Sequence, residues 1–118
     1  MKPEIRHSEP LPSRPLKADF SKGLVPAVVQ NAESGLVLMI AYMDEEAWAK
    51  TQATGRAWFH SRTRGLWEKG ATSGNVMEIV EARLDCDLDA VLLKVRPAGP
   101  ACHTGAESCF FNEVDPAP

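Results

Sequence analysis

Residues 24–43 read LVPAVVQNAESGLVLMIAYM, two runs rich in aliphatic residues on either side of a short polar segment. Runs of this kind, bounded by turn-forming residues, are typical of β-strands. The polar segment contains Asn31 and Gly35, two residue types that readily adopt the backbone angles of tight turns. The stretch therefore predicts a β-hairpin. Pro26 has no amide hydrogen to donate, so we expect it at an edge position or at the start of a strand.

A short helix is predicted directly after this hairpin, over residues 44–55. Asp44 is a suitable N-cap, and Glu45 and Glu46 place negative charge in the first turn, where the helix dipole favours it. Gly55 can end the helix because glycine tolerates the left-handed conformation of a C-cap.

Most of the remaining chain has the patterns of strands. Residues 56–60 form a short aromatic run, and residues 61–75 are basic and glycine-rich, as expected of a loop. Residues 76–89 alternate between apolar and charged side chains, and the aliphatic run 90–95 continues them, so we expect strands in both. These patterns together predict an α+β fold dominated by strands, with mixed β-sheets and one main helix.

The length of 118 residues favours a single domain. We expect a mobile, proline-rich arm at 1–19, an ordered domain at 20–114 and a disordered tail at 115–118. The formal charge of −3 argues against non-specific binding to nucleic acid or to an acidic membrane. Because no apolar run could span a bilayer and no signal-peptide pattern is visible, we expect a cytoplasmic protein with reduced thiols.

All three cysteines lie within residues 85–109, at Cys86, Cys102 and Cys109. Three is an odd number that disulfides cannot fully pair, so metal ligation or catalysis is our first interpretation. Three thiolates would leave one position of a zinc tetrahedron open for water, as in catalytic zinc sites. The alternative is that the cysteines are buried as small hydrophobic residues.

The same segment carries three aspartates on alternate positions, Asp85, Asp87 and Asp89. On a strand they would project together, and their repulsion favours a hard cation such as magnesium or calcium. Alternatively they form a solvated acidic edge. Cys86 would point to the opposite face of a regular strand. One alternative is that the strand is bulged. The other is that the thiol and the carboxylates belong to separate sites, either because the strand lies between two metals of one chain or because the thiol reaches a site in a second copy of the chain. We favour the site shared with a second copy.

Two further groups of residues are candidates for the chemistry. His103, next to Cys102, could ligate zinc or act as a general base, or it could be an exposed turn histidine. The loop 61–75 has the residue types that hold phosphates and stack on bases, although it could equally be a solvated surface loop. Its candidate substrate-binding residues are Arg62, Arg64, Trp67, Lys69, Thr72 and Ser73. Together with a thiolate metal site, this loop suggests hydrolysis of a nucleotide.

The motifs GLVPAVVQ, VLMIAYMDEEA, SRTRGLWEKGATSGN, RLDCDLDAVLLKV and ACHTGAESCF together resemble the phosphoribosyl-AMP cyclohydrolase family of histidine biosynthesis. The resemblance covers residues 23–111. Two positions depart from the family's usual residues: Ala71 stands where glutamate is common, and His60 stands where an aromatic residue is frequent.

The resemblance implies hydrolytic opening of the purine ring between N1 and C6 by a zinc-activated water, in an interlocked homodimer that uses zinc and magnesium. By this similarity, Cys86 of one subunit joins Cys102 and Cys109 of the other around zinc. The three aspartates would hold magnesium, and His103 stands at the position of the catalytic histidine. The rival interpretation is a non-catalytic, zinc-stabilised nucleotide-binding module.

Overall fold

The computed structural model describes residues 17–117, so most of the predicted arm at 1–19 lies outside the described residues, as does Pro118. The order of elements is β1 (Val25–Asn31), β2 (Val37–Met43), α1 (Glu45–Thr54), β3 (Trp58–Ser61), β4 (Gly65–Glu68), β5 (Met77–Leu84) and β6 (Val91–Pro97). Four strands form one sheet in the order β2-β1-β6-β5, and β3 and β4 form a second. Only β1 and β6 pair in parallel among these strands. The predicted α+β, strand-dominated class is confirmed.

The predicted hairpin is present as β1 and β2, which pair antiparallel. Its turn is held by the side chain of Asn31, whose Oδ1 accepts hydrogen bonds from the amides of Glu33 and Ser34 at 2.8 and 3.1 Å. Pro26 pairs with β2, whereas pairing with β6 begins only at Ala27. β1 is therefore a central strand that tolerates proline at its start, and the edge position was the wrong alternative.

The predicted helix is confirmed as α1, with both caps at the expected residues. Asp44 Oδ1 accepts a hydrogen bond of 2.8 Å from the Ala47 amide, and Gly55 ends the helix at a φ of 71°. The buried hydroxyl of Thr51 donates to the Ala47 carbonyl and accepts from the Trp58 amide, which ties α1 to β3. No helix within residues 17–117 is long and apolar enough to cross a membrane.

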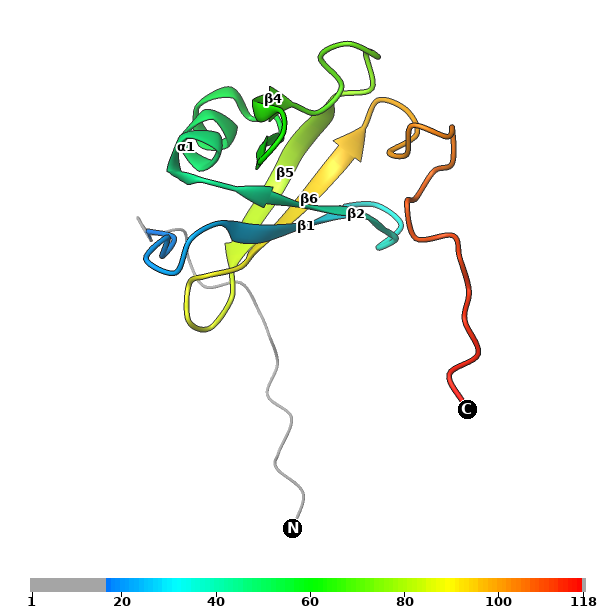
Figure 1. The fold of residues 1–118 in the computed structure, drawn as a ribbon. Helices are drawn as coiled ribbons and strands as arrows, with labels where there is room; N and C mark the ends of the chain where they lie inside the picture. The colour runs from blue at the N-terminus through cyan, green and yellow to red at the C-terminus, as the bar shows by residue number, and fades with distance from the viewer. Residues whose placement is uncertain (1–16, 118) are drawn as a thin grey trace.

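The core lies between the four-stranded sheet and a layer made by α1 and the β3–β4 hairpin. Figure 1 shows α1 and β4 on the same side of the sheet, and α1 contacts β2, β3 and β4. Phe59 of β3 is fully buried, as are Val29 of β1 and Leu93 of β6. Burying a side chain of this size stabilises a fold by about 1.5–3 kcal/mol, so this layer contributes directly to holding the sheet.

One structural prediction for the basic segment was wrong, because residues 61–75 are not a continuous loop. They contain β4, which pairs antiparallel with β3. The strand is only four residues long, too short to show a periodic pattern. It forms because Leu66 and Trp67 pack against the core, with the Trp67 ring centroid 5.2 Å from that of Phe59.

Candidate active site

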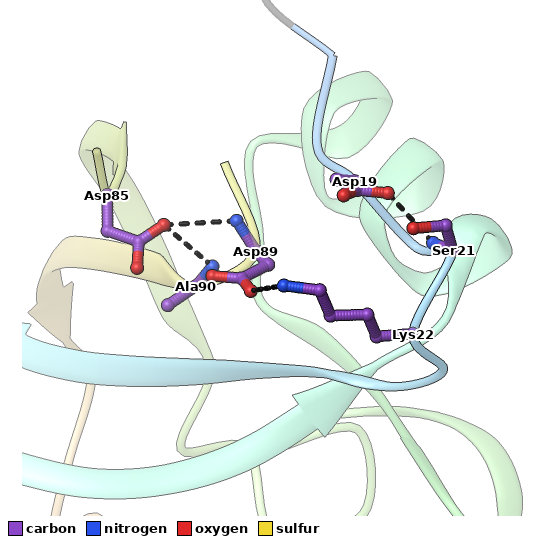
Figure 2. Close-up of polar contacts among 6 residues, drawn as sticks. All are labelled: Asp19, Ser21, Lys22, Asp85, Asp89 and Ala90. Atoms are coloured by element: carbon purple, nitrogen blue, oxygen red, sulfur yellow. Dashed lines mark hydrogen bonds and ion pairs between the residues drawn. The ribbon is translucent and has the colours of Figure 1, made fainter. Parts of the chain in front are cut away.

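The three aspartates lie on a turn and not on a strand, which corrects the strand predicted over residues 76–89. β5 ends at Leu84. Beyond it, Asp85 Oδ1 accepts hydrogen bonds from the amides of Asp89 and Ala90 at 3.0 and 3.1 Å, as Figure 2 shows. Leu88 adopts a φ of 67°, which no regular strand allows. The argument that Cys86 must face away from the aspartates on a strand therefore does not apply.

The turn brings the carboxylates together more tightly than a strand would. Ligand oxygens of Asp85, Asp87 and Asp89 lie within 4.8 Å of one another, and no other group of three potential metal ligands within residues 17–117 is as close. The pKa of Asp87 is raised by the hydrogen bonds that its protonated carboxyl donates to Asp89, the larger effect, and to Asp85. The hydrogen bond with Asp87 and then that with Lys22 lower the pKa of Asp89. The carboxylates thus compete for protons.

Within residues 17–117, one ammonium reaches this group, since Lys22 Nζ lies 3.2 Å from Asp89 Oδ2. A single positive charge leaves the group with a net negative charge when all three carboxylates are ionised. Hard oxygen ligands at this spacing fit a divalent cation such as magnesium.

Cys102 and Cys109 lie together in the loop that follows β6, close enough for their thiols to interact. The Thr104 hydroxyl donates a hydrogen bond of 3.1 Å to Cys102 Sγ and lowers the pKa of that thiol. Burial raises the pKa of Cys109, whose amide is fixed to the Leu38 carbonyl at 2.7 Å. The two thiols therefore differ in how readily they ionise, and both are sulfur donors suited to a soft cation such as zinc.

Cys86 does not join this pair within the chain. It lies on the aspartate turn at one end of β6, and the loop with Cys102 and Cys109 follows the other end (Figure 1). Seven extended residues span about 20 Å. Cys86 is exposed. One chain therefore offers an aspartate cluster and two thiols, with the third thiol at the far end of the strand.

An open cavity of about 640 Å³ lies on the side of the β3–β4 hairpin, next to the start of β1. Two residues predicted to bind substrate, Arg62 and Trp67, line it. Lys22, Tyr42 and His60 also line it, and sequence analysis had given none of them a role in binding. Two cations, two aromatic side chains and an imidazole in one cavity suit a phosphorylated ligand with a ring.

Hydrogen bonds and ring contacts orient two of the lining residues. His60 Nδ1 lies 3.2 Å from Asp44 Oδ2, so the N-cap of α1 also holds the imidazole and leaves Nε2 for a ligand. The guanidinium of Arg64 lies 4.4 Å over the ring of Trp67. The indole N–H of Trp67 is buried and has no acceptor among the described residues, which fits a ligand that supplies one.

The phosphoribosyl-AMP cyclohydrolase family model matches residues 39–111, which include β3, β4, the aspartate turn and the thiol loop. The chain belongs to this family. A phosphoribosyl-AMP cyclohydrolase of Listeria monocytogenes is 53% identical over 84% of this chain and 95% of the relative. Those of Rhizorhabdus wittichii and Bacillus cereus are 60% and 51% identical, over 79% and 84% of this chain and 76% and 99% of the relatives.

In this member of the phosphoribosyl-AMP cyclohydrolase family, the remaining predicted residues lie outside the cavity. Lys69 reaches the thiol loop, where its ammonium donates to the Ala101 carbonyl at 2.6 Å. Thr72 and Ser73 are exposed in the turn after β4. His103 is exposed and makes no hydrogen bond or ion pair with another described residue. The basic segment thus serves two places, the cavity with Arg62 and the thiol loop with Lys69.

The signals that would have pointed to the missed residues are weak. His60 departs from the family's usual aromatic residue but nothing near it in sequence marks Asp44, sixteen positions earlier, as its partner. Lys22 is a single lysine in a short polar stretch before the first strand, and no motif marks it. Tyr42 lies in an aliphatic strand and reads as an ordinary β residue.

Proposed function

We propose that this protein catalyses hydrolytic opening of the adenine ring of phosphoribosyl-AMP, between N1 and C6, in histidine biosynthesis, at a site shared by two copies of the chain. The observation that carries the proposal is that the three thiols lie beyond the two opposite ends of β6. The family match includes all three thiols and all three aspartates. Yet Cys86 lies at the opposite end of β6 from the other two thiols, so a three-thiol site needs a second copy.

Cys102 and Cys109 of one copy, with Cys86 of the other, would hold zinc. Asp85, Asp87 and Asp89 would hold magnesium. When bound, zinc would supply Lewis-acid activation of a water, and magnesium would supply charge for the substrate's phosphates.

The dimer also explains how two distant loops act on one substrate. Cys86 lies between Asp85 and Asp87, so the copy that delivers its thiol also brings its aspartate turn to the partner's thiol loop. The edge strand β2 supports such an assembly, because Ile40 and Tyr42 on it are 48% and 50% exposed. Exposed apolar side chains on a strand at the edge of a sheet favour burial against another chain.

The cavity holds one phosphoribosyl end of the substrate in this proposal. Lys22 and Arg62 bind its phosphate by charge, and Tyr42 contacts the ribose or base by its ring. His60 offers Nε2 to a hydroxyl because Asp44 engages Nδ1. A substrate with a phosphate at each end then uses the cations of the cavity for one and the aspartate-bound magnesium for the other.

His103 moves the proton in the reaction. Its imidazole accepts a proton from the water that attacks C6, and it returns the proton to N1 as the C6–N1 bond breaks. The exposed position of His103, beside Cys102, leaves the ring free to approach the reacting atoms. A positioned proton-transfer group of this kind contributes about 10²- to 10⁴-fold to turnover.

The proposal is tested by incubating the zinc- and magnesium-loaded protein with phosphoribosyl-AMP while the ultraviolet spectrum is recorded. Ring opening changes the chromophore, so a progressive spectral change that depends on enzyme concentration is expected. Binding without a spectral change would overturn the proposal and favour a non-catalytic nucleotide-binding module. The His103→Ala variant is the matched control, because it keeps the metal ligands and lacks the proton-transfer group.

A further inference from the structure

Lys22 lies where the cavity meets the aspartate cluster. Its ammonium is 3.2 Å from Asp89 Oδ2, and Lys22 is also one of the residues that line the cavity, together with Arg62 and His60. Among the described residues that line the cavity, only Lys22 contacts an aspartate of the cluster. One residue therefore belongs to both sites.

The backbone around Lys22 is fixed to the aspartate turn, while its side chain is largely exposed and, among the described residues, held only by the contact with Asp89. The Asp19 amide donates a hydrogen bond of 2.7 Å to the carbonyl of Leu88, between Asp87 and Asp89. The Gly23 amide donates to the Phe20 carbonyl at 3.0 Å and closes the turn that carries the lysine. Figure 2 shows Lys22 extending from this turn to Asp89, and its side chain is 72% exposed. An exposed lysine changes rotamer easily, so it can leave Asp89 without moving the backbone.

The Lys22 ammonium contacts Asp89, a carboxylate that a divalent cation bound to the aspartate cluster would also use as a ligand. A cation held by all three aspartates competes with Lys22 for the negative charge of Asp89, and two positive charges at such short range repel. Binding of the cation thus favours release of Lys22. The released ammonium remains at the cavity, where it adds to the charge of Arg62.

We propose that Lys22 alternates between Asp89 and an anionic group of a ligand in the cavity, and that it thereby couples cation binding to phosphate binding. This inference rests on the proposed magnesium site and extends it to the substrate's phosphate. The coupling is reciprocal by thermodynamic necessity: a phosphate that attracts Lys22 frees Asp89 and tightens cation binding by the same factor. Because an exposed ion pair is weak, the factor is about two- to fivefold.

The test is calorimetric titration of Mg²⁺ into the zinc-loaded, full-length protein, with and without AMP as the phosphate-bearing probe. In the wild type, AMP should tighten Mg²⁺ binding about two- to fivefold. In Lys22→Gln, Mg²⁺ should bind about two- to fivefold more tightly without AMP, because the competing ammonium is absent, and AMP should have no further effect. Lys22→Arg should retain the coupling.

Lys50→Gln is the matched control, since it removes the same charge from the exposed surface of α1, where Lys50 lies 5.4 Å over the Trp58 ring. It should behave as the wild type. Unchanged or weaker Mg²⁺ binding by Lys22→Gln without AMP, or wild-type coupling in this variant, would overturn the role of Lys22 alone. Absence of Mg²⁺ binding by the wild type would overturn the magnesium assignment and the coupling with it, while turnover of phosphoribosyl-AMP reports on the proposed reaction separately.

Discussion

Lys69 and Ala101 are joined by a hydrogen bond of 2.6 Å, from the ammonium to the backbone carbonyl, across 32 positions of sequence. Ala101 is buried and directly precedes Cys102. The contact attaches the thiol loop to the turn after β4, and the charge of Lys69 adds to the effects that favour ionised thiols at both Cys102 and Cys109. A residue that sequence analysis assigned to substrate thus supports the proposed zinc ligands.

Removal of the Thr104 hydroxyl should make Cys102 harder to ionise. This hydroxyl is the largest cause of the lowered pKa of Cys102, because it donates a hydrogen bond to the thiolate. In zinc-free Thr104→Val the pKa should rise, so the rate of alkylation by iodoacetamide should fall at neutral pH and its midpoint should move to higher pH. Thr104→Ser keeps the hydroxyl and should resemble the wild type; equal midpoints for both variants would contradict the assignment.

Two inactive cysteine variants should restore activity when mixed. Cys86→Ala and Cys102→Ala should each lose zinc and turnover. After subunit exchange, a mixed dimer would hold one site with all three thiols, because one variant supplies Cys86 and the other supplies Cys102 and Cys109. With about half of the dimers mixed, activity should reach about a quarter of the wild type. No recovery, despite exchange demonstrated by mass spectrometry, would mean that the site is not shared.

Loss of one aspartate should weaken magnesium binding without affecting zinc binding. Asp87→Asn removes a charge from the cluster and leaves all three thiols in place, so magnesium dependence should weaken while bound zinc is unchanged. Metal analysis and activity as a function of Mg²⁺ concentration provide the measurement. Glu33→Gln, on the exposed turn between β1 and β2, is the charge-matched control. Zinc loss from a folded Asp87→Asn protein would indicate one mixed site instead.

His103→Ala should retain zinc and lose turnover by about 10²- to 10⁴-fold, the usual contribution of a positioned proton-transfer group. Zinc content by metal analysis and kcat by the ultraviolet assay are measured on the same preparation. A zinc-free protein would make His103 a ligand, and full activity would make it an ordinary exposed histidine.

Gly70→Ala should destabilise the fold more than Gly74→Ala. Both glycines have positive φ, at 86° and 81°, but a Cβ at Gly70 would lie 2.3 Å from backbone atoms of Asn75 and Val76, whereas Gly74 faces open space. We expect a loss of about 1–2 kcal/mol for Gly74→Ala and about 3 kcal/mol or more for Gly70→Ala. Urea unfolding at equal protein concentration measures both, and equal losses would contradict the close approach.

Local chemistry was sufficient to predict the first hairpin and the helix. Asn31 accepts from its own turn's amides, and Asp44 and Gly55 cap α1, so the contacts that define these elements lie within five positions in sequence. The same holds for Thr104 and Cys102, two positions apart. Patterns of residue type carry such contacts because the partners are neighbours along the chain.

The aspartates show where a pattern misleads. Alternation over residues 76–89 predicted a strand, but Asp85 accepts hydrogen bonds from two amides of its own segment and closes a turn. An aspartate side chain competes with strand pairing because it offers nearby backbone amides another hydrogen-bond acceptor. The residue types were therefore sufficient to predict that the three carboxylates lie together, although the predicted strand geometry was wrong.

The sequence alone determined the family, the strand-dominated class, the capped helix and the residue types of the candidate site. Only the tertiary structure decided that Cys86 and Cys102 lie at opposite ends of β6, that Lys69 serves the thiol loop, and that Lys22 joins the cavity to Asp89. The physical reason is that these relations depend on how the sheet and the β3–β4 hairpin pack. Side chains such as Lys22 and Asp89, 67 positions apart, meet only after buried apolar residues have fixed the strands that carry them.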